Sequence, residues 1–437
     1  MARATSAKAD IVSTARKVKL EICGDWEIQV SGEGGLKPVR LTVSPPCLKQ
    51  VFAEPCEPMP VFNPEAGGWV KGYRLKRVRT HETTAKGSLV PESLVLRAGP
   101  EADAPLLKAG TDYQADLEWG TVGWAGDAGP AAGRVAFASY THGESRIDSI
   151  IASTAGRIEI RQGELDVTLP RPPALKKGEI LLANVWLPVR VAGLTPDHLF
   201  PVLETGYPGK PASGEAPAKK QIPKTYARLL SGEPLKILAW GDSVTDGAYF
   251  TDLSDRWQEQ FVRRLCGKYP KANITLITEA WGGRNTDSYR AEPPGSIHNY
   301  KEKVLAVKPD LIVSEFVNDG WMSSEQTHER YGVILEEFRG IGAEWIILTP
   351  HYILPEWMGP AWAGVTRLKD IDDDPRGYVK GLRAFAAANN LALADASLRW
   401  GRLWRQGIPY MTLMHNAINH PDVRGMRMFV DSLMALF

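Results

Sequence analysis

The chain has no excess of charge of either sign and no hydrophobic run long enough for a membrane helix. Its 437 residues carry 52 Lys and Arg against 51 Asp and Glu, a formal net charge of +1. A balanced charge gives no electrostatic reason to expect nucleic acid or an anionic membrane as a partner. No apolar stretch reaches the roughly 18 residues of a transmembrane helix. We therefore expect no nucleic-acid partner and no membrane span.

The start of the chain also lacks the apolar core of a secretory signal. The first ten residues read MARATSAKAD, which are small, polar or charged. A signal peptide needs a continuous apolar segment, so none is predicted in this sequence. A trimmed extracytoplasmic protein would have the same start, and the sequence leaves both the compartment and the oligomeric state open.

Cysteine is scarce, and its spacing matches no zinc or redox motif. The histidines likewise lack the spacing of a shared metal site, so we expect no metal and no cofactor. Two of the cysteines are nine positions apart and could form a disulfide in an oxidising compartment; free thiols are the alternative. The four cysteines are Cys23, Cys47, Cys56 and Cys266.

The first half of the chain has the composition of β-structure. Segments such as 157–161 and 165–169 alternate apolar and polar residues, with Gly and Pro between them. This period of two predicts a β-sandwich-like accessory domain over residues 61–203. Residues 1–60 are Pro-rich and form either a wrapping arm or the first strands of that domain. Residues 204–234 combine Pro, Gly and Lys with few apolar residues, which predicts a linker.

From residue 235 to residue 437 apolar strands alternate with amphipathic helices. Such alternation predicts an α/β domain with a doubly wound, three-layer parallel sheet. Right-handed crossovers place every strand-to-helix loop at the same sheet edge. The expected strands are 235–240, 273–279, 310–317, 344–349 and 391–395, and the expected helices are 254–269, 297–307, 326–339, 375–389 and 422–436.

The first of these strands runs directly into a turn that carries a serine. The sequence is Gly241-Asp242-Ser243, after the apolar run 235–240. The serine hydroxyl therefore lies at the carboxyl end of a strand, where open α/β sheets bind ligands. The tripeptide alone is weak evidence, since turns are rich in these three residue types.

Three further loops at the same edge carry residues suited to acyl-transfer chemistry. A glycine pair, Gly282-Gly283, follows the second strand, and Asn318 follows the third. His420, followed by a proline, comes just before the last helix. Each feature alone has an ordinary structural explanation: a turn, a helix cap, a surface histidine. Their occurrence in the order Ser, Gly, Asn, His is much less expected by chance.

This set of motifs resembles the SGNH hydrolases, also called the GDSL esterase/lipase superfamily. The resemblance covers residues 235–437 and implies a flavodoxin-like three-layer sheet, the SGNH hydrolase fold. It implies that Ser243 is the nucleophile of a serine esterase and that His420 is its general base. The oxyanion would be bound by backbone N–H groups of Ser243 and Gly283 and by the side-chain amide of Asn318.

One position departs from the family pattern. The family usually has an Asp three residues before the His, and here that position is Ala417. His420 could instead be oriented by a backbone carbonyl, by Asn416, or by Asp395 or Asp422. We predict a working Ser–His pair with a non-standard or absent third member.

The aromatic residues of these loops bear on the substrate. Trp281 and Trp321 adjoin the glycine and asparagine motifs, and His351 follows the fourth strand. We take these three as candidate substrate-binding residues, although a structural role is also open to His351. Two more tryptophans, Trp357 and Trp362, follow in a Pro/Gly-rich loop. Exposed aromatic rings suit sugar faces better than they suit a long acyl chain.

The leading hypothesis is a carbohydrate esterase that removes acetyl or another small acyl group from a poly- or oligosaccharide. Its partner would be an acylated carbohydrate or another small ester. A lipase or thioesterase of the same superfamily is the second hypothesis. The third is a binding protein that has kept the fold and lost hydrolysis.

Overall fold

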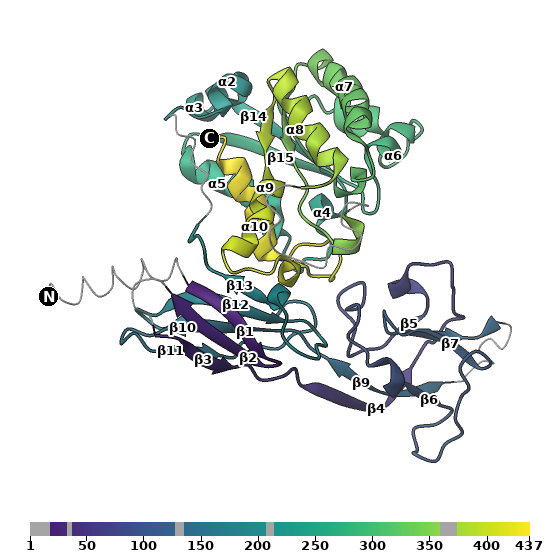
Figure 1. The fold of residues 1–437 in the computed structure, drawn as a ribbon. Helices are drawn as coiled ribbons and strands as arrows, with labels where there is room; N and C mark the ends of the chain where they lie inside the picture. Colours follow the sequence, from purple (N-terminus) through teal and green to yellow (C-terminus); the bar gives the residue numbers. More distant parts are fainter. Residues whose placement is uncertain (1–17, 33–36, 127–134, 207–213, 359–373) are drawn as a thin grey trace. The chain divides into compact units, whose positions relative to one another are not determined.

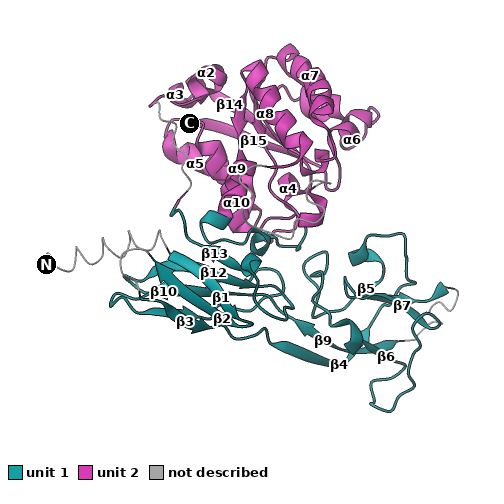
Figure 2. Cartoon of the chain, viewed as in Figure 1, with its two compact units in different colours: residues 1–205, 404–418 teal, residues 206–403, 419–437 magenta. Residues whose placement is uncertain are grey.

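The computed structural model describes residues 18–32, 37–126, 135–206, 214–358 and 374–437. The chain divides into two compact units: residues 1–205 with 404–418 form unit 1, and residues 206–403 with 419–437 form unit 2 (Figure 2). No described helix is long and apolar enough to span a membrane. The four cysteines are all free thiols.

Unit 1 begins with two antiparallel sheets that share a buried core. One sheet has the strand order β1-β2-β3 and the other β11-β10-β12-β13. Ile28 and Val30 from the first sheet belong to the same apolar cluster as Ile150 and Val185 from the second. The strands are β1 (Val18–Gly24), β2 (Glu27–Gly32), β3 (Val39–Thr42), β10 (Arg146–Ala152), β11 (Ile158–Arg161), β12 (Ile180–Leu187) and β13 (Leu199–Pro201) (Figure 1).

A second β-rich part of unit 1 has its own core. It contains two three-stranded sheets, with orders β4-β9-β6 and β5-β8-β7. Trp124, Leu96 and Tyr140 are among the side chains buried there. The strands are β4 (Leu48–Cys56), β5 (Tyr73–Arg74), β6 (Val95–Arg97), β7 (Tyr113–Asp116), β8 (Thr121–Trp124) and β9 (Ala136–Gly143). Unit 1 is thus rich in antiparallel strands, as expected.

Unit 2 contains one five-stranded sheet with the order β15-β14-β16-β17-β18, and every pairing in it is parallel. This is the order of a flavodoxin-like sheet, in which the first strand lies between the second and third. The predicted α/β fold is therefore confirmed. The strands are β14 (Pro234–Gly241), β15 (Asn273–Ala280), β16 (Leu311–Glu315), β17 (Glu344–Leu348) and β18 (Ala392–Ala394).

Helices cover both faces of this sheet. On one side α7 (Ser324–Gly340) packs against α8 (Gly377–Asn389), and on the other α5 (Trp257–Lys268) packs against α10 (Val423–Met434) (Figure 1). Because side chains alternate along a strand, a buried strand needs apolar residues on both faces. This requirement explains the continuous apolar run in β14. The short helices α4 (Ser243–Asp246), α6 (Thr286–Ala291) and α9 (Ala396–Gly401) follow strands β14, β15 and β18.

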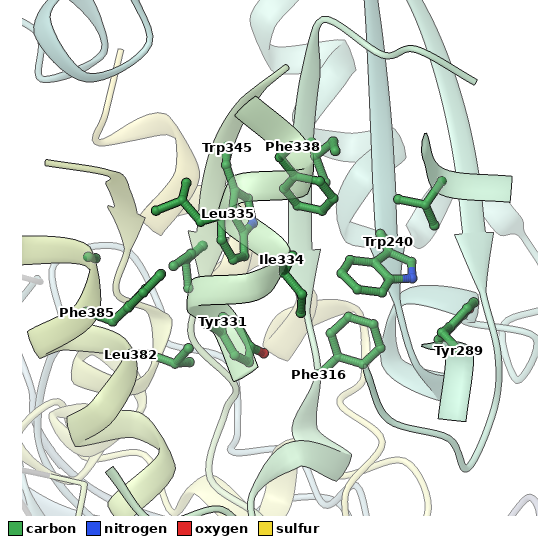
Figure 3. Close-up of a cluster of buried hydrophobic side chains, with 14 of the residues drawn as sticks. Trp240, Tyr289, Phe316, Tyr331, Ile334, Leu335, Phe338, Trp345, Leu382 and Phe385 are labelled. Atoms are coloured by element: carbon green, nitrogen blue, oxygen red, sulfur yellow. The ribbon is translucent and has the colours of Figure 1, made fainter. Parts of the chain in front are cut away.

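Trp240, the penultimate residue of β14, lies at the centre of an aromatic cluster in the core (Figure 3). Its ring centroid is 4.7 Å from that of Phe316, 5.6 Å from that of Tyr289 and 6.0 Å from that of Phe338. All four side chains are buried. These contacts fix the strand end that leads into Gly241-Asp242-Ser243.

The structure differs from the sequence-based organisation in several segments. The segment predicted as a linker contains α2 (Ala218–Gln221) and α3 (Pro223–Ser231), and α3 packs on β14. Pro223 occupies the first turn of α3, and Gly232 ends it in the left-handed conformation, with φ of 85°. The predicted helix 297–307 contains only a π-helical turn, Lys301–Leu305.

The predicted hydrolase domain 235–437 is also not continuous in space. Residues 404–418 group with unit 1, where Leu203 N and Glu204 N donate hydrogen bonds to Arg405 O. Trp362, predicted in the loop after the fourth strand, lies outside the described residues.

We predict that Trp240→Ala lowers the free energy of unfolding of unit 2 by about 3–5 kcal/mol, because it leaves a large cavity among rings that cannot all relax. Urea denaturation followed by fluorescence and circular dichroism would measure this. Trp321→Ala is the control: this residue is 51% exposed, so the loss should stay below about 1 kcal/mol. Equal losses for the two variants would contradict the role given to Trp240.

Candidate active site

Three strands end in register at the carboxyl edge of the parallel sheet. Gly241, the last residue of β14, is paired with Ala280 of β15 on one side and with Glu315 of β16 on the other. The loops that follow these strands carry Ser243, Gly282-Gly283 and Asn318. The register of the sheet therefore brings the first three predicted motifs to one place.

Gly241 is required because the backbone is crowded at this point. A Cβ on residue 241 would lie 2.2 Å from Thr245 Oγ1 and 2.4 Å from Glu315 O. Real Cβ atoms do not approach other atoms so closely, and the second contact is to backbone. Only glycine allows β14 to pass this close to β16 and then turn into α4.

Asp242 connects the serine loop to the asparagine loop. Its side chain is fully buried; Oδ1 accepts a hydrogen bond from Val244 N at 3.1 Å and Oδ2 accepts one from Asn318 N at 2.9 Å. Burial raises the pKa of this carboxyl to about 6, while the two backbone donors act in the opposite direction. Asp242 thus connects the two loops through its side chain.

The glycine loop packs against the serine. Trp281 N donates to Gly241 O at 3.1 Å, and a Cβ on Gly282 would lie 3.8 Å from Ser243 Cβ. Gly283 has φ of 72°, in the left-handed region that favours glycine. Asn318 Nδ2 donates one hydrogen to Arg284 O at 3.2 Å, which joins the asparagine loop to the glycine loop.

His420 lies beside Ser243. The distance from His420 Nε2 to Ser243 Oγ is 2.9 Å, a hydrogen-bonding distance. The imidazole stacks on the ring of Tyr249, with centroids 4.5 Å apart and planes 9° apart. A serine hydroxyl bonded to an imidazole nitrogen is the arrangement that nucleophilic catalysis by serine requires. The structure therefore brings these two predicted residues together.

The carboxylates considered as orienting groups for His420 make other contacts. Asp422 caps α10 through Gly425 N at 3.0 Å and pairs with Arg424 at 2.6 Å. Asp395 caps α9 through Leu398 N and pairs with Arg383 at 2.8 Å. That His420 works with a non-standard or absent third member stays a prediction.

Residues 416 and 417 belong to unit 1. Ala417, which stands where the family has Asp, has φ of 61°. The side chain of Asn416 is held by Glu82 Oε1 and by Ile418 N, each at 3.0 Å. Thr83 Oγ1 donates to Asn416 O. The amide of Asn416 thus has local structural contacts.

The three candidate substrate-binding residues have different environments. Trp321 is 51% exposed, with the guanidinium of Arg330 over its ring. Trp281 is half-buried and stacks on His298, with centroids 4.6 Å apart. His351 is fully buried, which leaves it no open surface for the substrate contact considered from the sequence.

Two further acids lie under the site. Asp319 accepts hydrogen bonds from Thr286 Oγ1 at 3.1 Å and from Tyr331 Oη at 3.0 Å, and burial raises its pKa to about 7. Glu315 is fully buried, and burial followed by the proximity of Asp242 raises its pKa well above the usual value. Clusters of carboxyls with raised pKa are typical of functional sites, although structural networks also produce them.

Comparison with known proteins supports the family assignment. Residues 239–428 match the model of the GDSL-like Lipase/Acylhydrolase family. The chain carries a GDSL-like hydrolase domain. The domain contains Ser243, Gly283, Asn318 and His420 within the matched residues, and its parallel sheet is of the SGNH type. No curated protein sequence matches the chain.

Solved structures that are similar to part of this chain have low sequence identity to it. One is a two-domain esterase active on acetylated mannans, with 14% sequence identity and a TM-score of 0.40. The match covers 50% of this chain and 52% of that esterase. Another is a variant of an acetylxylan esterase from Geobacillus stearothermophilus, with 19% identity and a TM-score of 0.35. That match covers 46% of this chain and 92% of the esterase. A third is a lipase/acylhydrolase from Enterococcus faecalis, with 18% identity and a TM-score of 0.32. This match covers 46% of this chain and 93% of the lipase/acylhydrolase. The chain thus matches about half the length of the two-domain esterase.

Sequence reasoning missed the contacts that Tyr249 and His351 make with the loop of His420. Tyr249 Oη donates to Pro421 O at 3.2 Å, and His351 Nε2 is 2.7 Å from Asn419 O. These residues contact the histidine loop from distant parts of the chain, so no local motif marks them. Among the described residues, no group of three or more His, Cys, Asp or Glu could hold a metal ion.

We predict that the buried acids make unit 2 less stable as the pH rises from about 4 to about 7. The folded pKa values of Asp242 and Asp319, about 6 and about 7, exceed the roughly 3.9 of an unfolded Asp. In that window the folded state binds more protons than the unfolded state, so the free energy of unfolding falls with pH. Asp319→Asn removes one titration and should flatten the slope by up to about 1.4 kcal/mol per pH unit.

Urea midpoints measured from pH 4 to pH 8 would check this. Glu329→Gln, at an exposed position on α7, is the matched control. A slope that is unchanged in Asp319→Asn would show that this carboxyl is not abnormally protonated.

Proposed function

We propose that the protein is a serine esterase that removes acetyl or another small acyl group from a poly- or oligosaccharide. The observation that carries this proposal is the 2.9 Å contact between Ser243 Oγ and His420 Nε2 at the carboxyl edge of the sheet. The family match supports the assignment to the hydrolases. The kind of ester that is hydrolysed is what we propose beyond that match.

The reaction would proceed through an acyl-enzyme. Ser243 Oγ attacks the ester carbonyl carbon while its proton moves to His420 Nε2. The tetrahedral intermediate then collapses, the bond to the alcohol oxygen breaks, and His420 returns the proton to that oxygen. Water, deprotonated by His420, attacks the acyl-enzyme in the same manner and releases the acid and free Ser243.

The negative charge on the intermediate would be stabilised by fixed donors. The backbone N–H of Ser243 is at the first position of α4, where no intrahelical acceptor exists. Asn318 Nδ2 carries two hydrogens and donates one to Arg284 O, so the second is available for an oxyanion. The positive φ of Gly283 supports its backbone N–H as the third donor. One such donor contributes about 3–4 kcal/mol to transition-state stabilisation.

Trp321 supports a sugar substrate. It follows Asn318 by three residues, and the residue is 51% exposed. The Arg330 guanidinium lies 5.1 Å from the ring centroid and is itself held by Asp287. An anchored, exposed indole beside an oxyanion donor is suited to stack on a sugar ring. Trp281, which is already stacked on His298, is a second and less exposed candidate.

Acetate release from a panel of acetylated polysaccharides, combined with nitrophenyl esters of increasing chain length, tests the substrate class. A carbohydrate esterase should prefer acetyl esters. Preference for long acyl chains would favour a lipase or thioesterase. No turnover and no labelling of folded protein by a fluorophosphonate would favour a binding protein.

We predict that Ser243→Ala and His420→Ala each reduce kcat by at least about 10³-fold without changing the fold, because each removes one half of the proton-transfer pair. Steady-state hydrolysis of 4-nitrophenyl acetate and circular dichroism would measure the two effects. Thr251→Ala, at an exposed position in the loop after α4, is the matched control and should keep full activity. Wild-type rates in Ser243→Ala would rule out the assigned nucleophile.

We also predict that Trp321→Ala raises KM for an acetylated oligosaccharide by roughly five-fold, the equivalent of losing about 1 kcal/mol of stacking. The kinetics of 4-nitrophenyl acetate should be unchanged in the same variant, because that substrate has no sugar to stack. Equal effects on both substrates would show that Trp321 supports the site rather than binds the sugar.

A further inference from the structure

We infer that His351 and Tyr249 are positioning residues that hold His420 toward Ser243 by fixing the backbone on both sides of it. The inference rests on the proposed function. It assigns to buried hydrogen bonds part of the orienting role that an Asp at position 417 would have in the family.

The two carbonyl groups that flank His420 each receive a hydrogen bond from a buried side chain. His351 Nε2 is 2.7 Å from the carbonyl oxygen of Asn419, the residue before His420. Tyr249 Oη donates to the carbonyl oxygen of Pro421, the residue after it, at 3.2 Å. Tyr249 also covers one face of the imidazole by stacking on it. The peptide unit directly before His420 and the peptide unit that follows Pro421 are therefore each held by a hydrogen bond.

His351 is a donor in this contact. A carbonyl oxygen can only accept, so Nε2 must carry the hydrogen. Burial, followed by the nearby charge of Arg376, lowers the pKa of His351 well below its usual value, so the ring is neutral with one N–H. Nδ1 is buried with no hydrogen-bond partner among the described residues, as fits the nitrogen without a hydrogen.

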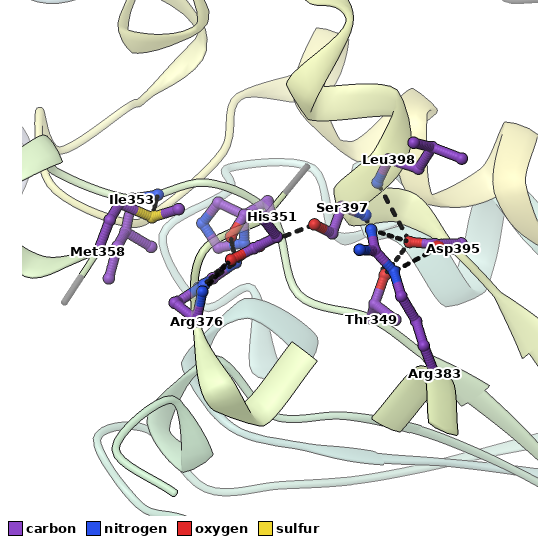
Figure 4. A network of polar contacts seen from close by, with 10 residues as sticks. Thr349, His351, Ile353, Met358, Arg376, Arg383, Asp395, Ser397 and Leu398 are labelled. Atoms are coloured by element: carbon purple, nitrogen blue, oxygen red, sulfur yellow. Dashed lines mark hydrogen bonds and ion pairs between the residues drawn. The ribbon is translucent and has the colours of Figure 1, made fainter. Parts of the chain in front are cut away.

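A buried ion pair holds His351 in turn (Figure 4). Arg376 Nη2 donates to His351 O at 2.7 Å, and Arg376 makes a two-pronged contact with Asp374, at 2.9 Å and 2.6 Å. Ser397 Oγ donates to the same carboxylate at 2.7 Å. Asp374 and Arg376 are almost completely buried, so water does not compete for these bonds.

The imidazole of His351 is also fixed by packing. Its ring centroid is 5.4 Å from that of Trp400 and 5.7 Å from that of Phe429. The chain Ser397–Asp374–Arg376–His351 thus places one N–H donor accurately against the residue before His420. A misplacement of about 1 Å in a reacting group can reduce the rate by roughly 10²-fold.

The test compares His351→Leu, which removes the donor, with His351→Gln, whose side-chain N–H can reach the same carbonyl. We expect His351→Leu to lower kcat by about 10- to 100-fold with KM little changed, and His351→Gln to recover most of the loss. Tyr249→Phe, which keeps the ring and removes the hydroxyl, should give a smaller loss in kcat. His328→Leu is the matched control, since His328 lies on α7 and packs on Phe385.

Crystal structures of the same variants give a readout that does not depend on turnover. We expect the contact of 2.9 Å between Ser243 Oγ and His420 Nε2 to be lost in His351→Leu and kept in His351→Gln. If the wild type hydrolyses no ester, the proposed function fails, and this geometry still decides the inference. Wild-type kcat and an intact contact in His351→Leu, or equal losses in His351→Leu and His328→Leu, would overturn it.

Discussion

The parallel register at the end of β14 is the constraint on which the site depends. Gly241 is paired with Ala280 and with Glu315, and only a glycine fits between Thr245 and the backbone of Glu315. The serine, glycine and asparagine loops therefore leave the sheet side by side. The aromatic cluster around Trp240 packs against this end of β14. Core residues therefore also fix the position from which the loops begin.

Asp242 converts this proximity into a fixed arrangement. Its buried carboxylate accepts backbone hydrogen bonds from the serine loop and from the asparagine loop, so Ser243 and Asn318 cannot move independently. Placing a carboxyl in so dry a position is unfavourable for the charged form, as its raised pKa shows. The protein thus gives up some stability at neutral pH to keep Ser243 and Asn318 in a defined relation.

The sequence was sufficient for the features encoded locally and insufficient for those set by distant contacts. Buried strands such as β14 and β16 are continuous apolar runs, and their order places the Ser, Gly and Asn motifs at one edge. α3 was missed because its Pro and Lys content resembles a linker; its helical state depends on burying Leu229 and on the cap at Gly232. No local signal marks His351 as a donor to Asn419, because the two residues are 68 positions apart.

The loop that carries His420 shows how this histidine can be oriented although Ala417 stands where the family has Asp. A carboxylate behind an imidazole does two things: it fixes the ring in space and it stabilises the positive charge that forms during proton transfer. Hydrogen bonds from His351 and Tyr249 to the flanking carbonyls, with the stacked Tyr249 ring, can supply the first. They cannot supply the second, because neither donor carries negative charge. An esterase arranged in this way would keep the geometry of the Ser–His pair, and the stabilisation of the imidazolium charge would have to come from another group.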